Sequence, residues 1–390
     1  MSNEIGIDLG TTHTVVARAG QALARTGEKP TVPSVIAYPP DAPLMIGWPA
    51  VGRAVIDAEN TILSSKRLIG LPYDAASAEL LQQQYGPELV ATHEGTYGFR
   101  TRAGVIDPIR VGAHLLSFAC RRLGITPVEV PELVVSVPAA FDTDQREATR
   151  LAAGAAGFAV VNLVAEPIAT AVAYLHRAGL HRAAVYDLGG GTFDVAVVDC
   201  STEPFQVLAH DGDLDLGGDD IDMALADLLA EELLQAHGWD LRTERMVYRR
   251  LVRGCERAKR KLRKRDSIKI EATQVDRAAP SHLPPIRVTR EHLAMAATPL
   301  LDRTFAICDR VLDEAKLKPG DIDAVFLAGG TCRMDLLKQR VEKYFGKRPR
   351  TDLDPLHVVA LGASFAAIRP GLIRLRNSGA FQRPSKPMRT

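Results

Sequence analysis

A turn motif that occurs twice constrains this chain more than any other feature of its sequence. The first copy, Asp8-Leu9-Gly10-Thr11-Thr12, and the second, Asp187-Leu188-Gly189-Gly190-Gly191-Thr192, each lie between two apolar runs. Each copy predicts a hairpin whose turn leaves backbone N–H groups free beside a carboxylate, and glycine lets a phosphate approach them closely. Two such turns facing each other would hold a nucleoside triphosphate and its metal ion between two lobes.

The elements that follow each turn are repeated as well. A buried strand at 134–137 and an alanine-rich helix opened by Glu166 follow the first turn. A strand at 323–327 and a similar helix opened by Asp354 follow the second. Three unlike elements in one order indicate an internal duplication and predict an α/β protein with two related lobes. The alternative is two unrelated α/β segments with ordinary glycine turns.

The length of 390 residues is enough for two domains with cores of their own. The predicted first lobe is 1–182, with an inserted subdomain at about 39–110 that is rich in proline and glycine. The second lobe is 183–368, with an insertion of charged helices and a short sheet at about 219–300. Residues 369–390 contain six basic residues, three prolines and no acid, which predicts a loose, disordered tail.

Charge and hydropathy argue against two classes of partner. The formal net charge is +1, so no overall field attracts nucleic acid or membranes. Residues 242–265 hold twelve basic side chains and two acidic ones, which would suit a nucleic-acid surface. A solvated helix face is favoured there because aromatic residues are not interleaved. The apolar run 151–165 is too short to cross a bilayer, so neither nucleic acid nor a membrane is an expected partner.

The cysteines and the first residues bear on the compartment. None of the five cysteines is part of a CxxC pair, so a zinc site or a redox motif is not predicted. The chain enters a strand almost at once and shows no basic segment followed by an apolar one, the pattern of a secretory signal. Free thiols in a reducing cytoplasm are therefore expected.

Together with further motifs, the two turns resemble the ATPase domain of the DnaK-type, seventy-kilodalton heat-shock chaperones. The resemblance extends from Ile5 to about Arg369, and no GxxxxGK[ST] P-loop is present. It implies two ribonuclease-H-like lobes around a nucleotide cleft, as in actin and the sugar kinases. The further motifs that carry it are Lys66–Gly70, Val135–Ala139, Gln145–Thr149, Leu216–Asp220, Cys255–Arg260 and Leu327–Arg333.

The resemblance assigns the metal-binding acids. Asp8 and Asp187, one in each turn, would hold Mg²⁺ through water, which suits an ion that gives up its hydration shell reluctantly. Asp194 would help to hold a monovalent cation such as K⁺, and an ordinary acid at a strand end explains it equally well. For a single acid such as Asp8, the alternative is a turn cap.

The resemblance also assigns the groups that act on the phosphates, where positioning and charge neutralisation matter more than covalent chemistry. Lys66 would reach the γ-phosphate and the attacking water, while Glu166 and Thr192 would orient that water. Asp187 would contribute its charge to the same step. The alternatives are an exposed lysine, a helix-start acid and a strand-end hydroxyl. The β- and γ-phosphates would lie against Gly10, Thr11, Thr12, Gly189, Gly190 and Gly191.

The nucleoside end is predicted from a third group of motifs. The spacing of Glu256, Lys259 and Arg260 places all three on one helix face. An arginine can stack on adenine while its neighbours bind the ribose, and a surface salt-bridge helix is the alternative. The adenosine pocket implied by the resemblance consists of Gly218, Glu256, Lys259, Arg260, Gly329, Gly330, Thr331 and Arg333.

The sequence also departs from the family pattern. A basic segment begins at Arg369 where the family has an apolar and acidic linker, and a peptide-binding domain is not expected to follow. Asn162 stands where a basic residue usually engages J-domain partners. Arg263 replaces a small hydroxyl residue at the nucleoside site, and Leu356 replaces an acid near it. Both insertions are shorter than in the bacterial chaperone, which leaves contacts with exchange factors open.

The sequence therefore predicts a monomeric, slowly hydrolysing ATPase that binds ATP or ADP with Mg²⁺ and couples the nucleotide to a protein partner or client of unknown identity. Three alternatives keep the fold. They are a nucleotide-gated interaction protein with negligible hydrolysis, a small-molecule kinase and an actin-like filament former.

Overall fold

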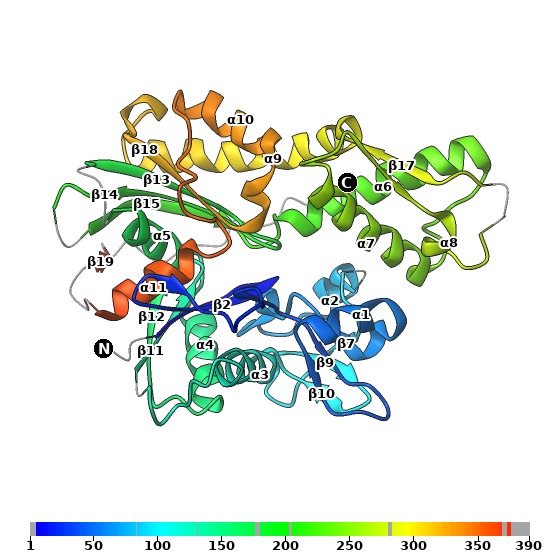
Figure 1. Ribbon diagram of the computed structural model, residues 1–390, viewed down its shortest axis with the longest axis horizontal. Coiled ribbons are helices and arrows are strands. Elements are labelled where there is room, and N and C mark those ends of the chain that lie inside the picture. Colours follow the sequence, from blue (N-terminus) through cyan, green and yellow to red (C-terminus); the bar gives the residue numbers. More distant parts are fainter. Residues whose placement is uncertain are drawn as a thin grey trace.

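Two mixed β-sheets and the two helices between them form the centre of the computed structural model (Figure 1). The structure describes residues 5–82, 84–130, 132–175, 180–202, 205–279, 283–368 and 373–375. Among these residues, no helix combines the length and the apolar composition that crossing a bilayer requires.

The first sheet contains the first phosphate turn between its strands β1 and β2. These two strands are antiparallel, β11 runs parallel to β1, and β12 runs parallel to β11. Helices α3 and α4 cover one face of this sheet (Figure 1). The bounds are β1 Ile5–Leu9, β2 His13–Arg18, β3 Gln21–Ala22, β4 Thr31–Pro33, β11 Glu132–Val137, β12 Val160–Ala165, α3 Pro108–Arg121 and α4 Thr143–Ala155.

The second sheet repeats this arrangement around the second turn. Strands β13 and β14 form the antiparallel hairpin, and β18 runs parallel to β13, as β11 does to β1. The duplicated α/β fold expected from the sequence is therefore confirmed. The bounds are β13 Arg182–Leu188, β14 Phe193–Asp199, β15 Phe205–Asp213, β18 Ala324–Ala328 and β19 Ile373–Leu375, with the helices α9 Arg290–Glu314 and α10 Asp335–Phe345 in the same half.

The two central helices each pack on the sheet of the other half of the chain. Helix α5 (Glu166–Leu175) follows β12 of the first sheet but packs against β13, β14 and β18 of the second, where Tyr174 stacks on Phe326 with ring centroids 4.4 Å apart. Helix α11 (Val358–Ile368) packs against β1, β2 and β11. Helix α5 also contacts β11 and β12 of the first sheet, and α5 and α11 pack against each other between the two sheets.

The crossing of α5 and α11 requires a glycine. A side chain at Gly362 of α11 would overlap the backbone carbonyl of Ala169 on α5. We expect Gly362→Ala to lower the free energy of unfolding by about 1–3 kcal/mol, because a packed backbone has to move. The matched control is Gly52→Ala in α1 (Trp48–Ile56), where a side chain would meet no atom within 4 Å. Urea unfolding of both variants checks this, and equal stability of the two would contradict it.

The first insertion consists of two small sheets and short helices. The loop that carries Lys66 lies here as the 3-10 turn η2 Ser65–Leu68. The remaining elements are β5 Ile36–Ala37, β6 Met45–Ile46, α1, η1 Ala58–Asn60, β7 Thr61–Ile62, α2 Ala75–Leu81, β8 Glu88–Ala91, β9 Tyr97–Thr101 and β10 Gly104–Ile106.

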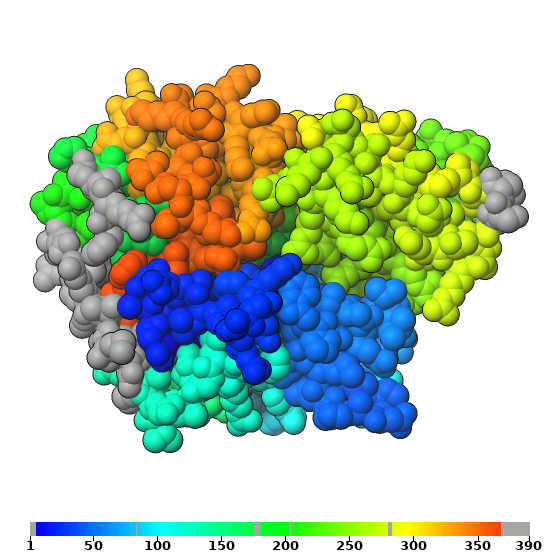
Figure 2. Space-filling model, viewed as in Figure 1, coloured from blue at the N-terminus to red at the C-terminus, as the bar shows by residue number. Residues whose placement is uncertain are grey.

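The second insertion lies directly over the first, and the two surfaces meet on the face that Figure 2 shows. Arg245 reaches across and donates to the backbone carbonyls of Gln82 and Tyr85 at 3.0 and 2.6 Å. The second insertion contains α6 Gly218–His237, α7 Arg245–Lys261, β16 Ser267–Ile270, α8 Ala272–Val275 and β17 Ile286–Thr289, and the 3-10 turns η3 Pro319–Asp321 and η4 Gly330–Arg333 follow α9.

The ends of helices α4 and α6 are set by local capping residues. Asp142 caps α4 by accepting the N–H of Gln145 at 2.9 Å. The charged helices predicted in the second insertion are α6 and α7, and α6 ends where Gly238 adopts a left-handed φ of 65°. The basic residues at 242–265 are exposed or half-buried, apart from Lys259, which is buried with the apolar face of α7.

Part of the predicted loose tail differs from expectation. Residues 373–375 form β19, which pairs in parallel with the edge strand β15 through backbone hydrogen bonds. An unpaired strand edge offers N–H and C=O groups to any extended segment that reaches it. The rest of the tail, 369–372 and 376–390, lies outside the described residues.

Candidate active site

A cleft with about 1150 Å³ of empty space, partly open to solvent, lies between the two sheets and the two insertions. Residues from both halves of the chain line it, and they include most of the site residues predicted from the sequence. The predicted residues that line it are Asp8, Gly10, Thr11, Thr12, Lys66, Glu166, Asp187, Gly189, Gly190, Thr192, Gly218, Glu256, Lys259, Arg260, Gly329, Gly330, Thr331 and Arg333.

Gly191 and Asp194 are the two predicted residues that do not line the cleft. Asp194 is buried behind it, opposite Asp187 in the β13–β14 hairpin. Gly191 faces the first lobe, where a side chain at this position would lie 2.7 Å from Cγ2 of Thr11.

The two duplicated turns have the same internal geometry and face each other. The N–H of Gly10 donates to the carbonyl of His13 at 3.1 Å, and the N–H of Gly189 donates to the carbonyl of Thr192 at 3.0 Å. A side chain at Gly190 would overlap Oγ1 of Thr12. That hydroxyl is buried and has no hydrogen-bond partner among the described residues. The turns thus place free donors on either side of a narrow gap.

Buried carboxylates crowd around Lys66 next to this gap. Nζ of Lys66 donates to Oε1 of Glu166 at 2.6 Å, and both side chains are 8% exposed. Oδ1 of Asp8 accepts a hydrogen bond from Ser136 at 3.1 Å. Burial and the charge of Glu166 raise the pKa of Asp8 to about 7. Burial would lower the pKa of Lys66, but Glu166 and Asp8 together outweigh it and raise that pKa.

Asp187 and Asp194 also lie in this cluster, where buried carboxylates outnumber the single ammonium of Lys66. Burial, followed by the charge of Glu166, raises the pKa of Asp187 well above its usual value and that of Asp194 to about 7. Oδ1 of Asp194 is buried without a hydrogen-bond partner among the described residues. These groups fit a bound cation, which would balance carboxylates that a single nearby ammonium does not.

The arrangement also bears on how an ion would be held. Nowhere in the described part of the chain do three histidine, cysteine or carboxylate side chains converge tightly enough to ligate a metal directly. Mg²⁺ usually keeps several of its waters and takes only one or two carboxylates with the substrate phosphates. Asp8 and Asp187 fit that mode, one from each turn.

The end of the cleft where the sequence predicts the nucleoside is built on α7 and η4. Nζ of Lys259 is buried and donates to the carbonyl of Gly218 at 2.6 Å and to Asp222 at 2.7 Å. Glu256, Lys259 and Arg260 all line the cleft, and Glu256 also accepts a hydrogen bond from Arg260 at 3.3 Å, as in a surface salt-bridge helix. Thr331 donates to the carbonyl of Gly189 at 2.7 Å and joins this end to the second phosphate turn.

The family of the chain follows from its sequence match. The family model described as Hsp70 protein matches residues 4–376. This chain belongs to the Hsp70 family. Hsp70 proteins are ATPases that bind ATP or ADP with Mg²⁺ and act on client proteins, so the matched region is a nucleotide-binding ATPase domain of the chaperone type.

The Hsp70 cleft of this chain also contains residues that the sequence reasoning missed. His13 follows the first turn directly, and its side chain lies between α7 and Trp48, with ring centroids 6.4 Å apart. Burial, then the charge of Arg260, lowers the pKa of His13 to about 4, so the imidazole stays neutral. Only its position beside the turn could have signalled it. The other lining residues that were missed are Asp219, Asp222, Met334, Pro355 and Val359.

Two departures from the Hsp70 pattern lie at the nucleoside end. Arg263 and Leu356 both line the cleft, as their sequence positions predicted. Arg333 also lines it and forms an ion pair with Asp354, the acid before α11. The nucleoside end is consequently rich in arginine, since Arg260, Arg263 and Arg333 all reach it.

Proposed function

We propose that this chain binds Mg-ATP between its two phosphate turns and hydrolyses it slowly to ADP and phosphate. The observation that carries the proposal is the convergence of two turns of the same geometry on the buried Lys66–Glu166 pair. Each turn contributes a carboxylate, Asp8 or Asp187, for the Mg²⁺ ion. Phosphoryl transfer needs this combination of in-line positioning and charge neutralisation, and little covalent chemistry from the protein.

The chain's own residues have distinct parts in the proposed reaction. The N–H groups and hydroxyls of the turns hold the β- and γ-phosphates, and the ammonium of Lys66 stabilises charge on the γ-phosphate oxygens. Glu166 and Thr192 orient the water whose oxygen bonds to the γ-phosphorus while the bond to the ADP oxygen breaks. Mg²⁺, when bound, neutralises charge on the phosphate oxygens. Asp194, behind Asp187, is the proposed contact of a K⁺ ion.

The adenosine would lie at the other end of the cleft. Arg260 and Arg333 present planar guanidinium groups there, which can stack on the base, while Glu256 accepts hydrogen bonds from the ribose. The buried Lys259 acts by fixing α7 to Gly218, because its ammonium is already bonded there. Gly329, Gly330 and Thr331 would close the floor of this pocket.

The nucleotide would regulate a protein partner through lobe closure. Helices α5 and α11 pack against each other between the two sheets. A nucleotide that draws the two phosphate turns together would therefore change the position of one lobe relative to the other. We propose a monomeric, cytoplasmic protein whose partner binds a lobe surface, with an affinity that depends on ATP or ADP. The lobes would be 1–182 and 183–368, with the insertions at about 39–110 and 219–300.

Calorimetry tests the proposal at its first step. Titration of the whole chain with Mg-ATP should release or absorb heat with saturation at one nucleotide per chain, whereas ATP with EDTA should bind much more weakly. The ring of Trp48 lies beside His13 at the cleft, so its fluorescence should change in the same titration. An absence of heat with Mg-ATP and with Mg-ADP would overturn the assignment of the site.

A further inference from the structure

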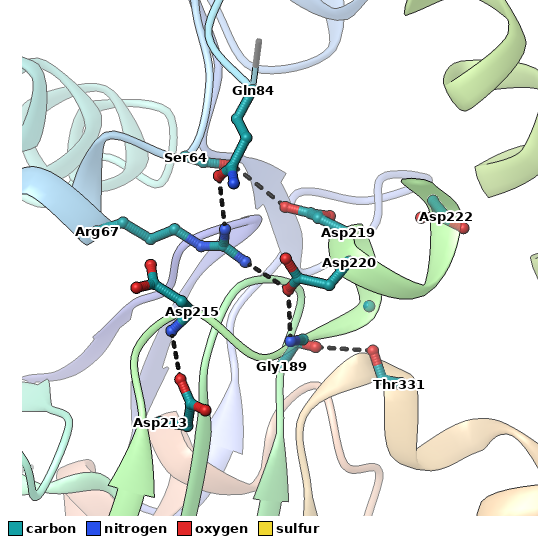
Figure 3. Close-up of polar contacts among 12 residues, drawn as sticks. Ser64, Arg67, Gln84, Gly189, Asp213, Asp215, Asp219, Asp220, Asp222 and Thr331 are labelled. Carbon is teal, nitrogen blue, oxygen red and sulfur yellow. Dashed lines mark hydrogen bonds and ion pairs between the residues drawn. The ribbon is translucent and has the colours of Figure 1, made fainter. Parts of the chain in front are cut away.

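A second buried cation lies beside Lys66, and the proposed reaction does not use it. Arg67 is the next residue of the turn η2, and its side chain is 4% exposed. It does not line the cleft. Instead it crosses from the first insertion to the second, where one of its terminal nitrogens binds Oδ2 of Asp220 at 3.0 Å (Figure 3). Its other terminal nitrogen donates to Gln84 at 3.1 Å.

The residue two positions before Lys66 has a strained backbone and also contacts the second insertion. Ser64 has a left-handed φ of 53°, a conformation that residues other than glycine adopt only when their surroundings impose it. The hydroxyl of Ser64 donates to Oδ2 of Asp219 at 3.3 Å, again across the two insertions (Figure 3). Two adjacent acids of α6 therefore hold the loop that carries Lys66.

The same acids connect to the second phosphate turn. Oδ2 of Asp220 also accepts the N–H of Gly217 at 2.7 Å. The N–H of Gly218 donates to the carbonyl of Gly189 at 3.0 Å, and the N–H of Asp219 donates to the carbonyl of Gly190 at 2.7 Å. A continuous chain of hydrogen bonds thus runs from the Arg67 guanidinium to the turn that would bind the phosphates.

Arg67 also contacts that turn from the side. A side chain at Gly191 would overlap Nε of Arg67, and this Nε is buried without a hydrogen-bond partner among the described residues. The guanidinium therefore lies against the second turn in the arrangement of the two lobes that the structure has. Movement of the lobes apart would separate it from Asp220 and from Gly191 at once.

We propose that Arg67 is a positioning residue that holds the Lys66 loop in place only when the cleft is closed over nucleotide. The proposal rests on the proposed function and adds a coupling between lobe closure and the position of Lys66. A buried ion pair adds little net stability, but removal of one partner leaves the other charge buried and unpaired. Loss of Arg67 would consequently favour the open cleft and withdraw Lys66 from the phosphates.

The test compares Arg67→Gln, Asp220→Asn and the double variant with wild type. Single-turnover hydrolysis should slow at least 10-fold in both single variants, and a fluorescent ADP analogue should dissociate faster. The double variant should lose no more than the worse single one, because all three lack the same pair. Arg67→Lys keeps the positive charge but loses the two terminal nitrogens that bond Asp220 and Gln84. If Arg67→Gln does not fold, Arg67→Lys replaces it in the test and should hydrolyse ATP more slowly than wild type.

Two further variants separate this role from others. Arg303→Gln removes an ion pair between α9 and Asp213, the last residue of β15, and should match wild type because Arg303 makes no contact with the Lys66 loop among the hydrogen bonds of the described residues. Arg245→Gln loosens the outer contact between the insertions and should speed ADP release without slowing single-turnover hydrolysis as much as Arg67→Gln does. Hydrolysis and ADP-release rates of Arg67→Gln and Asp220→Asn within twofold of wild type would overturn the inference. Losses that add up in the double variant would overturn it as well.

The ADP-release measurement keeps this inference separate from the proposed function. If wild type shows no hydrolysis, the proposed function fails, yet faster ADP release from Arg67→Gln than from Arg303→Gln would still support the contact across the cleft. If wild type hydrolyses ATP and Arg67→Gln releases ADP and hydrolyses ATP like wild type, the inference fails alone.

Discussion

Replacement of Lys66 by alanine should slow phosphate release about 100-fold or more while ATP still binds, a loss typical of removing one preorganised electrostatic group. The ammonium lies 2.6 Å from Glu166 among buried acids, so no other group in this part of the described cleft can take its place. Binding should survive because the turns, α7 and η4 supply most of the nucleotide contacts. Single-turnover phosphate release and calorimetry measure the two effects separately.

The control for this experiment is Lys338→Ala, which removes a half-buried lysine paired with Asp335 on α10 and outside the cleft lining. It should hydrolyse ATP at the wild-type rate. Equal phosphate release from wild type and Lys66→Ala would contradict the ATPase proposal. The chain would then fit the alternative of a nucleotide-gated interaction protein with negligible hydrolysis.

Asp187→Asn should reduce turnover by a similar factor, about 100-fold, because it removes a negative charge that balances the positive charge of Mg²⁺. For the same reason, half-maximal turnover should need a higher Mg²⁺ concentration. Asp8→Asn should act in the same way from the other turn. Without metal the expected effect on folding has the opposite sign. Burial, with Glu166 as the next cause, raises the pKa of Asp187 well above its usual value, so an uncharged amide should stabilise the metal-free chain.

Turnover as a function of Mg²⁺ concentration, together with thermal unfolding in EDTA, checks both signs. Asp194→Asn is the matched comparison, since its carboxyl lies behind Asp187 and outside the cleft. It should change the dependence on K⁺ and leave the Mg²⁺ dependence close to wild type. Wild-type Mg²⁺ dependence in both Asp8→Asn and Asp187→Asn would contradict the assigned metal site.

Much of the cleft was predictable because turn chemistry is local. The Asp-Leu-Gly segments carry their geometry in a few adjacent residues, and both turns form the same N–H to C=O hydrogen bond. The face of α7 that carries Glu256 and Arg260 follows from helical periodicity alone. His13 was missed because one histidine beside a turn has no pattern to distinguish it from an ordinary core residue.

The sequence by itself determined the duplicated hairpins and most of the residues that reach the cleft, since both depend on neighbours along the chain. Only the tertiary structure decided that α5 and α11 exchange sheets, that Gly362 must lie on Ala169, and that Arg67 pairs with Asp220. These contacts join residues separated by more than 150 positions. Such pairs are selected by packing and by the burial of charge, which leave no periodic mark on either segment.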